Sequence, residues 1–230
     1  MIAVQNRELV IPGQLIAEGD YRIREGVFRE GRAIYSSVLG LADIRGETIR
    51  VIPLNGPYVP KEGDMVIGVV ADMHSSGWIV DLNSPYYGNL LVSNYLRRKV
   101  DLNRESLHRF LRVEDVVALR VRDVDERKQV LLEGGYPGLG KLRGGKLIEI
   151  SPMKVPRVLG KKGSMLQILQ KEGGCRLLVG QNGRIMIWSK DPRNVVRVTE
   201  AILKIEKESH TSGLTDRIKL MLEKSKKEVN

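Results

Sequence analysis

Cysteine and histidine are both scarce in this sequence. The single cysteine, Cys175, cannot form an internal disulfide or a thiolate metal cluster, and its place in an apolar run predicts a small core residue. The three histidines, His74, His108 and His210, are scattered without the spacing of metal ligands. The sequence therefore predicts no metal site and no cofactor.

Long apolar runs are also missing. No stretch approaches the roughly 20 apolar residues needed to cross a bilayer. The first residues, MIAVQNRELV, lack the charged start and the long apolar segment of a signal peptide. We therefore expect a cytoplasmic protein without a membrane partner.

Catalytic patterns are absent as well. The sequence shows no acidic cluster at metal-binding spacing, no histidine pair and no activated nucleophile. We therefore expect no catalytic residues and a protein that is not an enzyme, against the rival hypothesis of a nuclease acting on its own.

Positive charge, by contrast, is abundant and unevenly distributed within a net charge of +10. Residues 136–205 hold fourteen basic and four acidic residues, whereas residues 1–135 hold eighteen basic and nineteen acidic ones. A nearly neutral body with one strongly basic part indicates a polyanionic partner. The alternative is a solvated basic face.

The basic part contains the sequence GKKG, which is Gly160, Lys161, Lys162 and Gly163, followed by Ser164 and an apolar run at helical spacing. Glycine allows positive φ and a close approach of the backbone to a ligand. A helix that begins near Ser164 would point its unpaired N–H groups at an anion. The lysines would add charge without reading sequence. These five residues form the predicted RNA-binding loop.

The segments around GKKG give it a structural context. The predicted elements are, in order, a strand at 146–150, a helix at 154–159, the GKKG loop, a helix that begins near Ser164, strands at 175–179 and 184–188, and a helix that follows Asp191. This order resembles a type I KH domain, whose GxxG loop clamps a short single strand of nucleic acid. A second GxxG spacing, from Gly180 to Gly183, is uncharged and lies between two strands, which favours a turn.

Residues 63–133 predict a separate β module. Its strands are expected at 65–73, 77–82, 89–92, 116–124 and 129–133, with an insertion between the third and the fourth. This pattern is typical of an OB-fold, and GDMVIGVVADMHSSGWIVDL with VEDVVALRVRDVDERKQVLL resembles an S1 RNA-binding domain. One face of such a barrel carries aromatic residues that stack on bases and cations that hold phosphates. The candidates are His74, Trp78, Tyr86, Tyr87, Tyr95, Arg97, Arg98, Lys99, Arg104 and Arg109.

Several of these candidates also have a structural interpretation. Trp78 lies inside a predicted strand and is as compatible with a core position as with stacking. Tyr86 and Tyr87 follow Pro85 in a predicted loop, which favours a functional role. The basic run at 97–99 is equally compatible with plain solvation.

The remaining segments flank these modules. Residues 1–60 predict a small all-β unit with balanced charge, which is more typical of a docking surface than of an active site, and a linker-like stretch at 55–60 ends it. Residues 134–145 hold six glycines and predict a hinge or a tight connector. Residues 206–230 predict a charged tail with one amphipathic helix through Leu214 and Ile218, which frays or docks on a partner.

The three modules together resemble one family over nearly the whole chain. The phrases VIPGQL, REGRAIYSSVLG, PYVPKEGDMVIGVV and LVGQNGRIMIW resemble the S1- and KH-containing RNA-binding cap subunits of the archaeal RNA exosome. Polynucleotide phosphorylase has the reverse order, with KH before S1 and catalytic domains ahead of both. The resemblance implies a multidomain fold, mostly β plus α+β, with an N-terminal β domain at 1–60, an S1 barrel at 63–133 and a βααββα KH domain at 141–205.

The resemblance also implies a non-catalytic function. In that family a trimeric cap sits on a hexameric ring of phosphate-dependent exonuclease subunits, the N-terminal domain holds the ring and the S1 domains surround the entrance pore. The cap captures single-stranded RNA and feeds it 3′ end first, with a preference for A-rich tails. The GKKG loop could face away from that path, in which case its lysines add only general attraction. The alternative is a free-standing S1/KH factor in translation or RNA processing.

Overall fold

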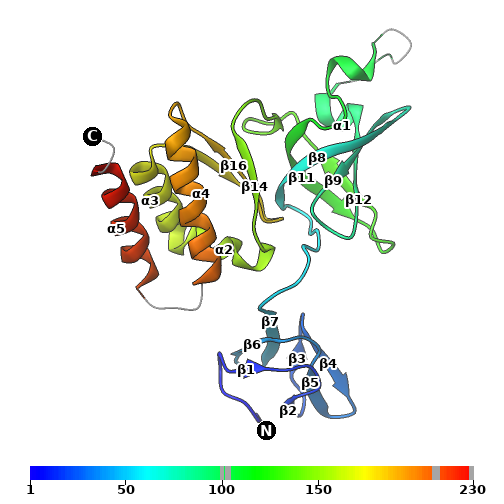
Figure 1. Cartoon of the computed structure of the whole chain (residues 1–230). Helices are drawn as coiled ribbons and strands as arrows, with labels where there is room; N and C mark the ends of the chain where they lie inside the picture. Colours follow the sequence, from blue (N-terminus) through cyan, green and yellow to red (C-terminus); the bar gives the residue numbers. More distant parts are fainter. Residues whose placement is uncertain (99–100, 102–104, 209–212, 228–230) are drawn as a thin grey trace. The chain divides into compact units, whose positions relative to one another are not determined.

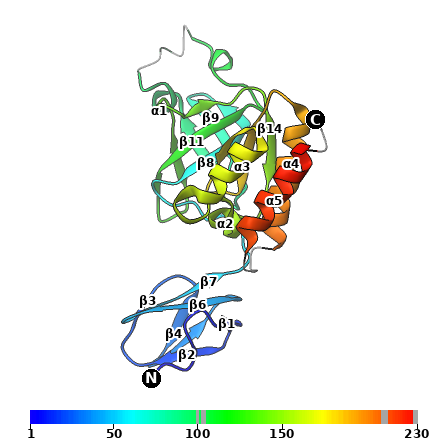
Figure 2. The same ribbon diagram turned by 90° about the vertical axis from the view of Figure 1, so that its left-hand side faces the viewer.

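The computed structural model describes residues 1–98, 101, 105–208 and 213–227, with side chains up to residue 223. The chain divides into two compact units, residues 1–56 and residues 57–230. Figures 1 and 2 show their elements. One hydrophobic core lies in the first unit and two lie in the second.

The first unit consists of short strands in two sheets. The strands are β1 (Leu9–Val10), β2 (Leu15–Glu18), β3 (Arg22–Ile23), β4 (Val27–Glu30), β5 (Ala33–Ser36), β6 (Gly40–Arg45) and β7 (Thr48–Pro53). One sheet has the order β1-β6-β7-β3 and the other has the order β2-β5-β4. Ile16, Ile34 and Ile49 are fully buried, because alternate residues of each strand point into the core. The predicted small all-β unit is confirmed.

The second unit begins with a closed five-stranded barrel. Its strands are β8 (Met65–His74), β9 (Gly77–Asp81), β10 (Gly88–Leu91), β11 (Val116–Val124) and β12 (Val130–Glu133). They follow the order β12-β10-β9-β8-β11, and the pairing of β12 with β11 closes the barrel. The insertion carries α1 (Val92–Leu96) and the 3-10 turn η1 (Leu107–Arg109). The OB-fold prediction is confirmed, with strand ends within one residue of those expected.

The barrel starts earlier than the sequence suggests. Tyr58 is only 5% exposed, packs into the barrel core, and donates from its hydroxyl to Asp64 Oδ2 at 2.7 Å. Burial, followed by this hydrogen bond, raises the pKa of Tyr58, so the hydroxyl stays protonated and can donate. The stretch expected as a linker therefore belongs to the barrel from Pro57 onward.

A KH domain follows in the same unit. Its elements are β14 (Lys146–Glu149), η2 (Pro152–Lys154), α2 (Val155–Leu159), η3 (Lys161–Gly163), α3 (Ser164–Gly173), β15 (Arg176–Val179), β16 (Arg184–Trp188) and α4 (Pro192–Lys207). The sheet order is β14-β16-β15, and the helices cover one face of this sheet (Figure 1). Asp191 caps α4 by accepting from the backbone N–H of Arg193. The βααββα prediction is confirmed.

The described part of the tail forms one more helix, α5 (Leu214–Lys227). Leu214, Ile218 and Leu222 are buried in the KH core, where α5 packs along α3 and α4. The tail helix therefore docks on its own chain instead of fraying. No helix in the described ranges combines the length and the apolar character needed to cross a membrane.

The connector between barrel and KH domain is tight and not a loose hinge. Its strand β13 (Gly140–Lys141) pairs antiparallel with β11, and Lys141 Nζ lies 2.5 Å from Asp115 Oδ2. The glycine-rich stretch thus adds an edge strand to the barrel sheet.

A second connection between the two modules is made by the turn at residues 180–183, which joins β15 to β16. Asn182 is fully buried there and bonds the barrel backbone three times, accepting from Ile67 N (3.2 Å) and donating to Ile67 O (2.8 Å) and Leu82 O (2.9 Å). Arg184, 5% exposed, pairs with Asp81 of the barrel and with Glu149. We call the interactions of Asn182 and Arg184 the barrel contact. It fixes the KH domain against the barrel.

Candidate nucleic-acid interface

The GKKG loop lies between α2 and α3 and has the backbone conformation that a phosphate-binding turn needs. Gly160 has φ 72° and ψ 174°, Lys162 has φ 53°, and Gly163 has φ 80°. Helix α3 begins directly afterwards at Ser164, and no side chain caps its N-terminus. Ser164 N–H donates to Lys161 O, and no side chain that the structure describes takes the remaining N–H groups of the first turn, which leaves those groups to an anion or to water.

The lysines of this loop are exposed and uncompensated. Lys161 and Lys162 form no ion pair with any residue in the described ranges. Other basic residues of the KH domain do have acidic partners, as Arg184 has Asp81 and Arg193 has Asp191. The loop therefore combines two unpaired positive charges with an open backbone.

The two loop glycines differ in their surroundings. A Cβ on Gly160 would lie 2.6 Å from the backbone nitrogen of Met165, so the chain itself requires glycine there. A Cβ on Gly163 would meet nothing within 4 Å. Gly163 therefore faces open space, where a ligand backbone can approach closely.

The aromatic candidates of the barrel are split between core and surface. Trp78 is fully buried, donates to Leu111 O at 3.3 Å and meets the Tyr95 ring edge-on at 5.5 Å. The stacking role expected for Trp78 is therefore wrong, because neither face of its ring is open. Tyr95 and Tyr86 are partly buried and pack against the same core. Burial raises the pKa of the Tyr95 hydroxyl. Tyr87, by contrast, is 62% exposed and remains a candidate for stacking.

His74 lies at the end of β8 and is held by hydrogen bonds. The backbone N–H of Ser76 donates to His74 Nδ1 at 3.3 Å, and Nε2 lies 3.1 Å from Asn89 Oδ1. An accepting Nδ1 leaves the proton on Nε2, which then donates to Asn89. The half-buried ring is thus oriented by its neighbours.

The basic candidates of the insertion are on the surface where the structure describes them. Arg98 forms a two-pronged pair with Glu105, at 2.9 and 2.7 Å, and Arg109 is exposed nearby. Lys99 and Arg104 lie outside the described residues. The Glu105 carboxylate removes part of the local positive charge.

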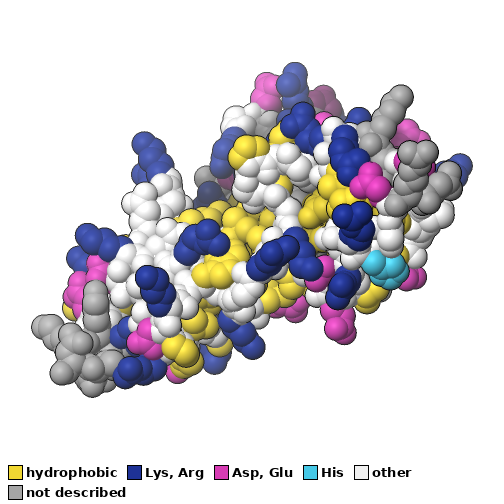
Figure 3. All heavy atoms as spheres, turned by 90° about the horizontal axis from the view of Figure 1, so that it is seen from above, with side chains coloured by type: hydrophobic (Ala, Val, Ile, Leu, Met, Phe, Trp, Pro, Cys, Tyr) yellow, Lys and Arg dark blue, Asp and Glu magenta, His cyan; other side chains and the backbone are white. Residues whose placement is uncertain are grey.

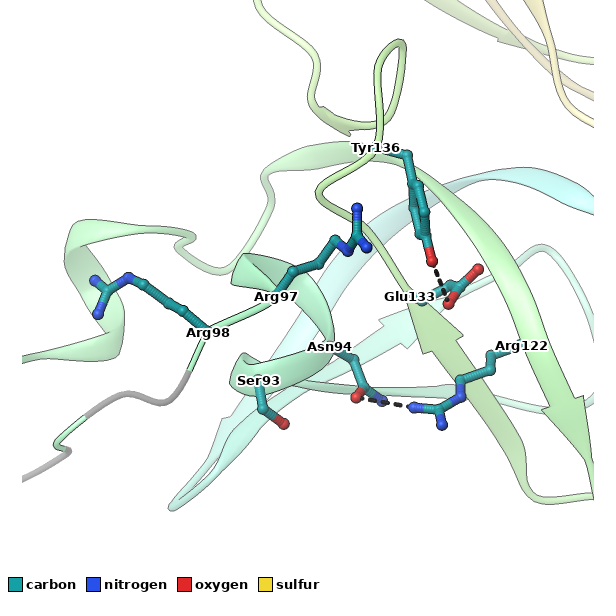
Figure 4. Close-up of a pocket in the computed structure, with 7 residues that line it drawn as sticks. All are labelled: Ser93, Asn94, Arg97, Arg98, Arg122, Glu133 and Tyr136. Atoms are coloured by element: carbon teal, nitrogen blue, oxygen red, sulfur yellow. Dashed lines mark hydrogen bonds between the residues drawn. The ribbon is translucent and has the colours of Figure 1, made fainter.

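A cavity of about 580 Å³ brings Arg97 together with residues that sequence reasoning missed. Its walls come from α1, the end of β12, β11 and the connector, as Figure 4 shows. The lining residues are Ser93, Asn94, Arg97, Arg98, Arg122, Glu133 and Tyr136. Arg97 and Arg122 lie on the same side as the Glu133 carboxylate, whereas Arg98 points away from it in Figure 4 and pairs with Glu105. The cations outnumber the carboxylate, which favours an anionic ligand.

Contacts within this cavity orient its cations. The Arg97 guanidinium lies 4.3 Å from the centroid of the Tyr136 ring, and Arg122 donates to Asn94 Oδ1 at 3.2 Å. Tyr136 donates to Glu133 Oε2 at 3.4 Å. Tyr136 lies in the glycine-rich connector, and only the fold of that segment back onto the barrel places it beside Arg97. The alternating pattern of β11 could have indicated that Arg122 is exposed.

Basic side chains are spread over both modules of the second unit. Figure 3 shows Lys and Arg lying over the barrel and the KH domain on one face, with acidic side chains among them. The cations do not merge into one stripe, so the candidate interface consists of separate sites on one rigid unit.

The fold and the site define a modular protein of the S1 and KH class. It combines an N-terminal β unit, an S1-type barrel and a KH domain with an open GxxG loop. Residues 7–55 match the family described as exosome RNA binding protein RRP4 N-terminal domain, residues 57–123 match RRP4, S1 domain, and residues 145–193 match KH domain. The chain belongs to the Rrp4 family of exosome complex components.

The relatives span the whole architecture. Exosome complex component Rrp4 of Pyrococcus furiosus is 51% identical over 96% of this chain and 84% of its own length. The protein of that name from Methanopyrus kandleri is 44% identical over 96% of this chain and 95% of its own length. A crystal structure of a proposed exosome complex RNA-binding protein aligns with TM-score 0.72 and 36% identity, over 76% of this chain and all of the other.

Proposed function

We propose that this chain is a non-catalytic RNA-binding cap subunit of an exosome, which captures single-stranded RNA and delivers it to the exonuclease ring. One observation carries the proposal: the exposed GKKG loop, with two unpaired lysines at the uncapped start of α3, in a chain of the Rrp4 family. The relatives are named as components of the exosome complex. The site binds a polyanion, and no step of bond cleavage is assigned to it.

Capture depends on charge and on backbone access. The lysines Lys161 and Lys162 neutralise phosphates, and the N–H groups at the start of α3 bind phosphate oxygens. The open side of Gly163 lets the sugar-phosphate chain lie against the loop. These contacts hold the backbone and carry little sequence information.

The barrel supplies additional contacts. Tyr87 offers an exposed ring for stacking, and the insertion residues Arg97, Arg98 and Arg109 offer cations. The barrel contact keeps these groups at a fixed distance from GKKG. Several weak contacts on one rigid unit then act together through a high effective concentration.

The N-terminal unit anchors the cap on the ring. Seven of the thirteen exposed large apolar residues in the described ranges belong to this unit: Met1, Ile2, Leu9, Ile11, Ile23, Phe28 and Leu39. Apolar surface at this density favours a protein partner. In the assembled complex a trimeric cap on a hexameric ring feeds RNA 3′ end first, with a preference for A-rich tails.

The test of RNA capture is the double variant Lys161→Glu with Lys162→Glu in the assembled complex. We expect RNA affinity to fall by at least about tenfold, and the slope of log affinity against log salt to become shallower by about 1.4, since each lost phosphate contact contributes about 0.7. Filter binding of labelled oligoadenylate over a salt series measures both.

A matched control introduces the same change of charge at a site away from the GKKG loop. Arg127 and Lys128 are an exposed basic pair in the turn between β11 and β12, and their double change to Glu leaves GKKG intact. We expect this control to alter affinity by less than half as much, in logarithmic terms, as the GKKG variant. Unchanged affinity and unchanged salt slope in the GKKG variant would refute the capture role.

A further inference from the structure

The outer face of the sheet β1-β6-β7-β3 in the first unit is divided into an apolar half and an arginine half. The register places Leu9 opposite Leu41, and Leu41 opposite Ile52. Further along the same strands, Asp43 lies opposite Arg50 and Arg45 lies opposite Thr48. Residues directly opposite one another, and residues two apart on a strand, share a face. All of these side chains therefore lie on one surface, which we call the split face.

The arginine half surrounds a cavity of about 260 Å³ lined by Arg24, Asp43, Arg45, Thr48 and Arg50. Asp43 is only 2% exposed and occupies the floor. Arg45 Nε donates to Asp43 Oδ1 at 3.2 Å, and Arg50 Nε donates to Asp43 Oδ2 at 2.7 Å. Burial tends to raise the pKa of Asp43, but the hydrogen bonds from Arg50 and Arg45 outweigh it and hold this pKa below its usual range. Asp43 is thus a fixed negative charge that orients two arginines.

The outer ends of these arginines remain unsatisfied. The Nη groups of Arg45 and Arg50 make no hydrogen bond within the described ranges, and their side chains are 67% and 39% exposed. Arg24 is exposed at the rim and has no side-chain partner in those ranges either. Three guanidinium groups around one carboxylate leave a net positive cavity whose free groups are all donors. The complementary ligand is an acceptor with two oxygens, such as a carboxylate or a phosphate.

The apolar half of the split face distinguishes between a carboxylate and a phosphate as the ligand. Leu9 is 54% exposed, and Leu41 and Ile52 are half-exposed beside it. A phosphate backbone gains nothing from an aliphatic surface, whereas a protein segment with an acidic side chain next to apolar ones matches both halves. The first 60 residues also carry seven basic and seven acidic residues, so they have no general attraction for nucleic acid.

We propose that the split face docks a protein segment whose acidic side chain enters the arginine cavity while neighbouring apolar side chains cover Leu9, Leu41 and Ile52. This inference rests on the proposed function, which makes the ring of exonuclease-type subunits the source of that segment. Beyond the proposed function, it specifies that the split face is the surface that binds the ring. It also specifies that the ring residue entering the arginine cavity is acidic.

The experiment uses the full chain and a ring reconstituted from exonuclease-type subunits of the same organism. Arg24→Glu places a carboxylate in the cavity without removing a hydrogen bond of the fold, and Leu9→Asp puts a charge on the apolar half. We expect each to weaken ring binding by at least about tenfold in biolayer interferometry, as truncated or reversed interface charges do. Arg32→Glu is the matched control, because Arg32 is exposed in the turn between β4 and β5, and we expect it to stay within about twofold of wild type.

The outcomes separate the two hypotheses. If the wild-type chain binds no ring, the proposed function fails and the docking inference with it. If the wild type binds but Arg24→Glu and Leu9→Asp bind equally well, only the docking inference fails. RNA binding by the free chain should be unchanged in both variants, and a loss there with intact ring binding would mean that the split face holds phosphate instead. Thermal unfolding at the wild-type temperature shows that the variants are folded.

Discussion

At the level of single residues, the two glycines of the GKKG loop have different roles: the fold requires one of them, and we expect the other to face the RNA. Gly160 and Gly163 have similar positive φ values, 72° and 80°, but only Gly160 is packed against the chain, beside Met165. Spacing alone cannot distinguish them, since both are glycines of one motif.

Gly163→Ala is predicted to weaken RNA binding and to lower stability by a similar, moderate amount. The alanine would have to adopt a left-handed backbone, which costs about 1–2 kcal/mol, but its Cβ would meet no atom of the protein. The same Cβ would stand where the RNA backbone approaches, so we expect affinity to fall about tenfold, or about 1.4 kcal/mol. Chemical denaturation and fluorescence anisotropy with oligoadenylate measure the two effects.

Gly160→Ala is the companion variant. Its Cβ would lie 2.6 Å from Met165 N, so it should lower stability much more than Gly163→Ala does. Wild-type RNA affinity in folded Gly163→Ala would contradict the close approach of RNA to the loop.

The barrel candidates were only partly predictable, because residue type alone does not say whether an aromatic side chain is buried or exposed. Trp78 and Tyr87 are both aromatic residues near strand ends, yet the first is fully buried and the second is 62% exposed. In a small barrel the interior is filled by alternate side chains, and sequence does not say which alternate set faces inward when both contain large residues. Tyr136 could not be found at all, because its contact with Arg97 depends on the fold of a glycine-rich connector.

At the level of elements, the five barrel strands were predictable from their pattern, whereas the strands of the first unit were predictable only as a group. Strand β6 (Gly40–Arg45) is an example, because it begins at one glycine and is followed by another, Gly46, and glycine is typical of turns. Gly40 is instead a strand residue at a close approach, since a Cβ there would lie 2.4 Å from Ile52 O. The helix α5 was predicted, but its packing along α3 and α4 depends on a groove that only the folded KH domain provides.

The barrel contact, by which the KH domain packs on the barrel, could not be predicted from the sequence. The turn at 180–183 was predicted as a turn, and its Asn-Gly pair fits that role. Its function as an anchor comes from Asn182, whose side chain makes three hydrogen bonds to the backbone of Ile67 and Leu82.

Asn182→Ala is predicted to loosen the KH domain from the barrel. It leaves buried backbone groups of Ile67 and Leu82 without partners, at a cost of about 2–3 kcal/mol. Native-state proteolysis within residues 134–145 should become faster, and RNA affinity should fall because the two modules no longer bind as one unit.

Gln181→Ala is the control for that variant, since Gln181 is exposed in the same turn and uses its backbone N–H, at 2.8 Å from Met65 O. It should unfold and bind like the wild type. Equal proteolysis of Asn182→Ala and Gln181→Ala would show that the connector, β13 and Arg184 hold the modules together without the Asn182 side chain.

At the level of the whole molecule, the chain separates two kinds of chemistry. Residues 1–56 carry balanced charge and exposed apolar side chains, which suit a protein partner. Residues 57–230 form a second unit in which the barrel and the KH domain hold cationic sites at fixed positions. Charge distribution predicted the basic character of the KH domain, because the surplus of basic residues falls within residues 136–205, but it did not separate the barrel from the first unit, since residues 1–135 are nearly neutral throughout.

In the assembled complex, RNA is expected to lie against the GKKG loop. The most direct measurement is photo-cross-linking of 4-thiouridine-labelled single-stranded RNA to that complex, with the cross-linked peptides of this chain identified by mass spectrometry. We predict cross-links in the peptide that contains Gly160 to Ser164, weakened at high salt and lost in the Lys161→Glu, Lys162→Glu variant. Cross-links confined to other parts of the chain, with none in this peptide, would contradict the account.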